Sequence, residues 1–258
     1  YFMTKEIEWL NLIFGYFLLT IPILALLYYR TGLVNDTLIA VGRMTGQLLL
    51  VGLYLDIIFE YDKLWINLLW VSIMVVVGGF TIVKRSELKL RHFLLPSFIS
   101  LLISTLCVEL YFLNFVVNAE NIFMARLFIP ITGILMGNSV RSTVIGLNTY
   151  YSELKQKRTL YRYALANGAT KKEALMPFMS DAMKKAFNPL IANIAVVGLI
   201  SLPGVMTGQI IEGSEPMTAI KYQIMLMIIV FTNALLTMLL TIELANKKVI
   251  DGRGNLRV

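Results

Sequence analysis

The chain has 258 residues, of which 57% are hydrophobic and 15% are charged, and its mean hydropathy is +0.73. Ordinary soluble domains carry about 25% charged residues, so this composition excludes that class and indicates a membrane protein with several spans. A single cysteine, Cys107, and a single histidine, His92, exclude an internal disulfide and a clustered Cys/His zinc site. The net charge of +7 fits basic cytoplasmic loops better than nucleic-acid binding, and we expect no nucleic-acid partner.

Seven segments have the length and apolar character of membrane spans, since a helix needs about 20 mostly apolar residues to cross a bilayer. We therefore expect an all-α polytopic membrane protein that forms one domain over residues 1–258. The predicted spans are Leu10–Tyr28, Leu38–Phe59, Leu64–Val83, Phe93–Val117, Ile122–Tyr150, Asn188–Ile211 and Ile220–Ala245.

The basic residues predict the orientation of these spans in the cell (inner) membrane. If the C-terminus is cytoplasmic, only Lys5, Lys63, Arg126 and Lys221 of the 23 Lys and Arg residues lie on the outer side. The excess of basic residues on the cytoplasmic side then predicts an outer N-terminus. More of the acidic residues lie on or near the outer side, so we expect a net acidic outer face.

Three acidic residues lie within or beside the spans, where ionisable side chains are usually functional. Asp56 and Glu60 share one face of the second span, and Glu109 lies in the outer third of the fourth. Because carboxylates suit hard or borderline cations, we predict that these three could bind a metal ion along an exit path. Further side chains predicted to line the path are Met136, Asn138, Met206, Thr207 and Gln209.

Simpler roles stay open for several of these residues. Asp56 and Glu60 could be exposed at the interface, and Glu109 could form a structural pair with Arg126. The two methionines could be packing residues.

Three GxxxG pairs favour close helix packing in the second, fifth and sixth spans. Pro203 precedes the last pair and interrupts the sixth span, which frees backbone groups that lipid does not satisfy. We expect the three spans to pack tightly around something polar. The glycines are Gly42, Gly46, Gly133, Gly137, Gly204 and Gly208.

A long basic loop, residues 151–187, separates the fifth and sixth spans. A helix is predicted over Ser152–Ala166, with a stop at Asn167-Gly168. Thr170 and Glu173 match a capping box that begins a short helix. We expect Pro177 to end that helix after about six residues, before another helix over Ser180–Phe187. Asn188-Pro189 would then cap the sixth span.

The run Ala164–Thr170, followed by Glu173-Ala174-Leu175, resembles the cytoplasmic loop of ABC transporter permeases. In that class a short coupling helix sits in a cleft of the ATPase subunit. The alternative is a solvated loop that only joins two spans. The resemblance implies an ATPase-docking site made by Tyr161, Ala164, Gly168, Ala169, Thr170, Glu173 and Leu175.

Two further motifs, SLPGVMTGQII at Ser201–Ile211 and PITGILMGNS at Pro130–Ser139, closely resemble the bacterial Fet-type iron-export ABC permeases. Plant relatives of that family act in aluminium tolerance. The likeness extends from Gln47–Gly52 to Ile220–Ile224. It implies a homodimer of permease chains that exports a metal ion, driven by two separate ATPase subunits that hold ATP and Mg²⁺. For some plant relatives it implies a nucleotide sugar as the substrate.

The chain has no Walker A sequence, so we expect it to bind no ATP and no cofactor of its own. No Ser, His, Cys or paired-carboxylate constellation predicts an enzyme. Three functions stay open at this stage: an ABC permease for a cation, the same architecture for an anionic conjugate, and a membrane scaffold. The acidic outer face favours the cation.

Overall fold

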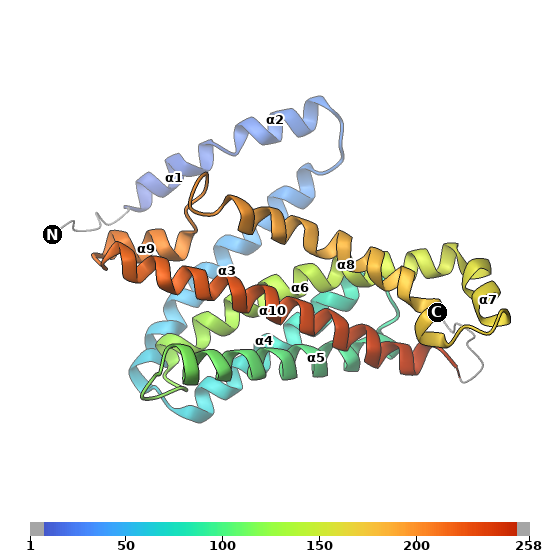
Figure 1. Cartoon of the computed structure of the whole chain (residues 1–258). Helices are drawn as coiled ribbons and strands as arrows, with labels where there is room; N and C mark the ends of the chain where they lie inside the picture. The colour runs from blue at the N-terminus through green and yellow to red at the C-terminus, as the bar shows by residue number, and fades with distance from the viewer. Residues whose placement is uncertain (1–7, 252–258) are drawn as a thin grey trace.

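The computed structural model describes residues 8–251, and these residues form a helical bundle (Figure 1). Within this range no strand is formed, so the all-α prediction is confirmed. Lys5, Arg253 and Arg257, which entered the charge count, lie outside the described residues. The elements are α1 (Trp9–Phe17), α2 (Thr20–Tyr28), α3 (Val34–Tyr61), α4 (Leu64–Arg85), α5 (Leu90–Tyr111), the π-helical turn η1 (Phe112–Val116), α6 (Ala125–Gln156), α7 (Arg158–Ala166), α8 (Lys171–Val196), α9 (Gly204–Glu212) and α10 (Pro216–Val249).

Five helical segments between residues 8 and 251 are long and apolar enough to cross a membrane. They correspond to the first four predicted spans and the seventh. The fifth predicted span is α6, a long helix that carries Arg126, Asn138 and Arg141. The sixth is divided between α8 and α9, so a total of seven crossings stays a prediction. The five segments are Leu10–Tyr28, Val34–Tyr61, Leu64–Arg85, Leu90–Val116 and Pro216–Val249.

The core lies between α4, α5, α6 and α10, and α8 packs on the outside of α6 (Figure 1). Two glycines permit the closest approaches. A Cβ at Gly146 of α6 would lie 2.1 Å from Sδ of the buried Met238 of α10, and one at Gly78 of α4 would lie 2.6 Å from Cδ2 of Leu101. These close-packed glycines are not the ones that the GxxxG pattern selects.

Polar side chains join the same helices inside the core. Asn233 of α10 donates hydrogen bonds to Ser139 of α6 at 2.9 Å and to Thr105 of α5 at 3.3 Å. Ser104 and Thr237 share another hydrogen bond between α5 and α10. Interhelical bonds of this kind hold membrane helices together, because lipid offers no competing partners.

The predicted GxxxG packing is not formed within one chain. A Cβ at Gly42, Gly46, Gly137, Gly204 or Gly208 would meet no atom within 4 Å. A Cβ at the sixth glycine, Gly133, would lie 3.5 Å from Cε of Met74, which is an ordinary contact. The GxxxG spacing identifies helix faces that carry only small residues, but it does not identify the helix that packs against them.

The first two apolar segments are peripheral in the single chain. In Figure 1, α1 and α2 lie along one margin of the molecule, and α5 lies along the opposite margin. The most apolar stretches of the Leu10–Tyr28 and Val34–Tyr61 segments contain no buried residue. Only the C-terminal part of α3 joins the bundle, where Ile58 packs against Ala125 and Ile129 of α6.

Asp62 anchors the turn between α3 and α4 to the start of α6. Its Oδ1 accepts a hydrogen bond from the backbone N–H of Ala125 at 2.8 Å and another from the Asn67 amide at 3.2 Å. Asn67 is fully buried and also donates to the Phe123 carbonyl at 2.9 Å. A carboxylate beside the first N–H of a helix stabilises it, because the N-terminal end is electropositive.

Replacing Asp62 with Ala should lower the free energy of unfolding by about 1–2 kcal/mol, because it removes an acceptor shared by two donors. The measurement is the melting temperature of the detergent-purified chain. The control is Asp56→Ala, which removes an exposed carboxylate from the preceding helix α3 and should leave the melting temperature unchanged. An equal decrease for both variants would contradict the role of Asp62.

Candidate functional site

The basic loop predicted over residues 151–187 includes a helical hairpin, which is made of α7, a tight turn and the N-terminal part of α8. Gly168 has a φ of +89°, a left-handed conformation that favours glycine. Thr170 accepts from the Glu173 backbone N–H at 3.3 Å, and the Glu173 carboxylate accepts from the Thr170 N–H at 2.8 Å. The predicted capping box is therefore confirmed. These bonds, from the Thr170 backbone first and then its hydroxyl, lower the pKa of Glu173 below its usual range.

The prediction that Pro177 ends a short helix is wrong. Helix α8 continues through both Pro177 and Pro189, so the predicted helix boundary at Asn188 is also absent. Both prolines are exposed, and a carbonyl that loses its helical donor on the exposed face can bond to water instead. The hairpin therefore leads directly into a long helix rather than into a separate coupling helix.

Two further expectations for this segment need correction. The predicted helix over Ser152–Ala166 is interrupted at Lys157, where α6 ends and α7 begins. Tyr161, predicted to dock the ATPase, is 1% exposed and packs in the core of the chain. Its burial leaves it unavailable to a partner, so it supports the hairpin from within.

The other predicted docking residues lie on or near the hairpin surface. Gly168, Thr170 and Glu173 are exposed, and Ala164, Ala169 and Leu175 are half-buried.

Large exposed apolar side chains on the hairpin were missed by the sequence prediction. Leu160 and Tyr163 of α7 are 56% and 67% exposed, and Met176 of α8 is 61% exposed. Leu160 and Tyr163 lie three residues apart on one face of the helix, a spacing that could have identified them. These exposed apolar side chains on an otherwise basic hairpin are candidates for contact with a partner.

Hydrogen bonds connect the base of the hairpin to α10. The Asn246 amide of α10 donates to the Tyr150 hydroxyl at 2.9 Å, and its oxygen accepts from the Tyr151 hydroxyl at 2.9 Å. Lys171 at the start of α8 donates to the Asp251 carbonyl at 3.0 Å. The hairpin and the C-terminal end of α10 lie at the same end of the molecule (Figure 1). A displacement of the hairpin would therefore act directly on α10.

The break between α8 and α9 creates a second candidate site. Residues 197–203 form a turn in which Gly198 has a φ of +89° and its N–H donates to the Ser201 carbonyl at 2.9 Å. An apolar cavity of about 580 Å³ lies beside this turn and is lined partly by Met206 and Gln223. A smaller cavity of about 150 Å³ includes Asn138, Gly204 and the same Gln223.

The structure thus brings together part of the predicted substrate path. Asn138 and Met206 line neighbouring cavities, and the buried Gln223 of α10, which the prediction did not include, belongs to both. Gln209 is nearby in sequence on α9, and its Oε1 is buried without a hydrogen-bond partner. The Thr207 hydroxyl donates to the Pro203 carbonyl at 3.1 Å, within the first turn of α9. Met136 packs in the core, which agrees with the alternative that it is a packing residue.

The three acidic residues of the predicted path are not assembled into one site. Asp56 and Glu60 are exposed on α3, whereas Glu109 is fully buried in α5. Across residues 8–251, no group of three His, Cys, Asp or Glu side chains is close enough to hold a metal ion. Within one chain the predicted carboxylate ligand set is therefore not formed, because α3 packs too little of its length against the bundle.

Glu109 has a different partner from the one suggested by the sequence. Both carboxylate oxygens lie near the Thr132 hydroxyl of α6, at 2.9 and 2.7 Å. Arg126, the alternative partner, instead lies over the Phe59 ring at 5.9 Å from its centroid. In the described part of the chain, Glu109 is the only buried residue among the Asp, Glu, Lys, Arg and His side chains. A buried ionisable group within a membrane helix is costly, and such groups are usually functional.

These features define a multi-pass helical membrane protein with a surface hairpin at one end and a broken helix beside its core. A family model matches residues 9–250, so the chain belongs to the uncharacterised protein family UPF0014. The resemblance predicted from the motifs in α6 and α9 is thereby confirmed.

Several relatives align over most of the chain. The UPF0014 membrane protein YjkA of Bacillus subtilis is 30% identical over 81% of this chain and 82% of its own length. The probable iron export permease protein FetB of Escherichia coli is 30% identical, over 89% and 87% respectively. Protein ALUMINUM SENSITIVE 3 of Arabidopsis thaliana is 33% identical over 75% of this chain and 69% of its own length. No solved structure matches the chain.

Proposed function

We propose that the chain is the transmembrane permease subunit of an ABC exporter that moves a metal cation, with iron as the first candidate, out of the cytoplasm. Two copies assemble with two copies of a separate ATPase subunit, which binds ATP and Mg²⁺. The N-terminus lies outside the cell membrane, and the C-terminus and the α7–α8 hairpin lie in the cytoplasm.

The observation that carries this proposal is the hairpin, with Leu160, Tyr163 and Met176 exposed on its surface. Apolar helix faces of this kind are commonly bound in a groove of a partner protein. The chain has no nucleotide-binding sequence, so the energy must come from that partner. The Escherichia coli relative is named as a probable iron export permease, which supports export and the choice of ion.

The force from the partner reaches the membrane through α10. Lys171 of the hairpin donates a hydrogen bond to the Asp251 carbonyl, directly after α10. Asn246 of α10 forms hydrogen bonds with two tyrosines of α6. The same helix carries Gln223, which borders both cavities at the α8–α9 break. Rotation or sliding of α10 would therefore change the shape of these cavities, which is how ATP hydrolysis would alter access to the path.

The path itself passes beside the broken helix. Amide oxygens from Asn138 and Gln223 and the thioether of Met206 are ligands that a borderline cation accepts. The open glycines Gly42 and Gly46 of α3 pack against a second copy of the chain. That contact would also cover the face of α3 that is bare in the single chain.

Replacing Glu109 with Gln should reduce metal tolerance in cells and lower the transport rate by roughly tenfold, because it removes the buried carboxyl group from the bundle. The variant keeps the size of the side chain and an oxygen that can accept from Thr132, so its protein level should equal that of the wild type. Glu109→Asp is the control that retains a carboxyl group at this position. Unchanged tolerance in Glu109→Gln would remove this residue from the path.

The proposed function is tested by ATP-dependent iron accumulation in proteoliposomes that hold the permease and its ATPase with their cytoplasmic faces outward. ATP added outside should drive iron into the lumen, and vesicles with the ATPase alone should accumulate none. Transport of a nucleotide sugar but not iron would favour an anionic substrate. No ATP-dependent transport of either would favour a scaffold.

A further inference from the structure

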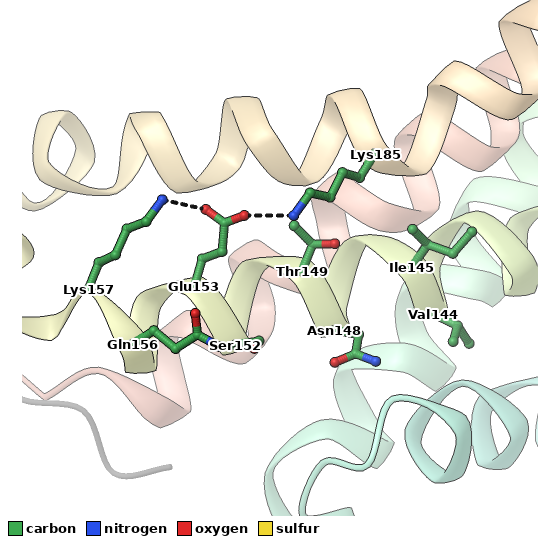
Figure 2. A pocket seen from close by; sticks show the side chains of 9 residues that line it. All are labelled: Val144, Ile145, Asn148, Thr149, Ser152, Glu153, Gln156, Lys157 and Lys185. Carbon is green, nitrogen blue, oxygen red and sulfur yellow. Dashed lines mark hydrogen bonds and ion pairs between the residues drawn. The ribbon is translucent and has the colours of Figure 1, made fainter.

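A polar pocket lies between α6 and α8, where α6 passes the predicted end of the fifth span at Tyr150. Its volume is about 470 Å³. Figure 2 shows that it is built on consecutive turns of α6, with one lysine, Lys185, contributed by α8. None of the functions discussed above uses this pocket.

The α6 residues of the pocket change in character along the helix. Val144 and Ile145, within the predicted span, form its apolar end. Asn148 and Ser152 follow at intervals of one turn and provide hydrogen-bonding groups. Lys157 then closes the charged end, beyond the span. An apolar end at membrane depth and a charged end outside it match a ligand that is itself apolar at one end and charged at the other.

The charged end has an excess of positive charge. Glu153 accepts from Lys185 Nζ at 2.9 Å and from Lys157 Nζ at 3.2 Å, as the dashed lines in Figure 2 show. These two lysines, Lys185 first, hold the pKa of Glu153 below its usual range, so its carboxylate is charged at cytoplasmic pH. Two ammonium groups share this one carboxylate, which leaves one net positive charge.

Both lysines have capacity for a second anion. Each ammonium group has three N–H donors, and one of them is directed to Glu153. The side chains of Lys157 and Lys185 are 52% and 61% exposed, so a ligand can reach them. A metal cation would be repelled by the pair, whereas a phosphate group would accept their hydrogen bonds and neutralise the excess charge.

We propose that this pocket binds an anionic phospholipid, with its phosphate group between Lys157 and Lys185 and an acyl chain along Val144 and Ile145. Basic pockets between membrane helices on the cytoplasmic side are known to hold anionic head groups. The apolar end favours a lipid over free phosphate, because a free ion would leave Val144 and Ile145 uncovered. The bound lipid would connect α6 to α8 at the inner leaflet.

Native mass spectrometry of the purified full chain in neutral detergent tests this site, with phosphatidylglycerol and phosphatidylcholine of identical acyl chains as probes. The wild type should retain phosphatidylglycerol with about 30-fold preference, as expected for two lysines that each contribute about 1 kcal/mol. Lys157→Gln/Lys185→Gln should lose that preference, and Lys157→Arg/Lys185→Arg should keep it. Equal retention of the two lipids by the wild type would overturn the proposal.

A matched control uses lysines that do not line the pocket. Lys155→Gln/Lys184→Gln removes the same charge from neighbouring exposed positions and should keep the preference. An equal loss in this control would show general surface attraction and overturn the site.

Competition with inorganic phosphate separates the two sources of the anion. Displacement of phosphatidylglycerol by phosphate at equal concentration would overturn the lipid assignment, and no displacement would support it. Should the double Gln variant fold poorly, the wild type still tests the proposal, because its equal retention of the two lipids would overturn it.

Discussion

The Tyr163→Ala/Met176→Ala variant should bind the partner ATPase about 1,000-fold more weakly than the wild type. Both side chains are more than half exposed on the hairpin, at 67% and 61%, and truncating buried anchors of an interface typically costs about 2 kcal/mol or more each. The loss should appear as failure of the two proteins to copurify, while the melting temperature of the isolated permease stays unchanged. Binding is measured by titrating the labelled ATPase onto permease in nanodiscs.

Leu199→Ala/Ile200→Ala is the matched control for that experiment. These residues are also large, apolar and exposed, at 91% and 82%, but they belong to the turn after α8 rather than to the hairpin. Their truncation should leave ATPase affinity unchanged. An equal loss for both pairs, or no loss for Tyr163→Ala/Met176→Ala, would contradict the assignment of the hairpin as the docking surface.

Replacing Gly146 with Val should strongly destabilise the bundle, because the new side chain would occupy the position of Met238. The Cβ alone would lie 2.1 Å from the Met238 Sδ and 2.8 Å from its Cγ, and Met238 is fully buried, so its side chain would have to be displaced within the core. Overpacking of a tight core costs about 1–3 kcal/mol or more, so we expect a decrease in melting temperature of roughly 5–10 °C. The measurement is thermal unfolding of the purified chain in detergent.

Two further variants identify the cause of that decrease. Met238→Ala combined with Gly146→Val should recover at least half of the lost melting temperature, because it vacates the contested volume. Gly137→Val, on the same helix, should leave the stability of the single chain unchanged, since a Cβ there meets no atom within 4 Å. Failure of Met238→Ala to compensate would show that the α6–α10 contact is not the source.

Features that depend on neighbouring residues in the chain were predictable from the sequence. Hydropathy over about 20 residues was sufficient for the five apolar helical segments, and the capping box at Thr170 and Glu173 was recognisable from its spacing. Motif likeness in α6 and α9 was sufficient for the family. Each of these depends on local chemistry and on no knowledge of which helices touch.

Features that depend on tertiary contacts were not predictable in the same way. Pro177 was expected to end a helix, but α8 continues because its ring is exposed and the freed carbonyl can be solvated. Tyr161 was expected to be on the docking surface, but the hairpin folds it against the core. Gln223 was missed as a cavity residue because only the α8–α9 break places it beside Asn138.

The coupling of ATP hydrolysis to iron flux in reconstituted vesicles, compared between the wild type and Gly168→Leu/Glu173→Lys, is the most direct test of the proposed mechanism. The first substitution puts a branched side chain at a φ of +89°, and the second removes the capping carboxylate and reverses its charge. We expect the variant to lose ATPase binding and iron transport together. Full complex assembly with an unchanged ratio of iron moved to ATP hydrolysed would contradict the role of the hairpin in driving transport.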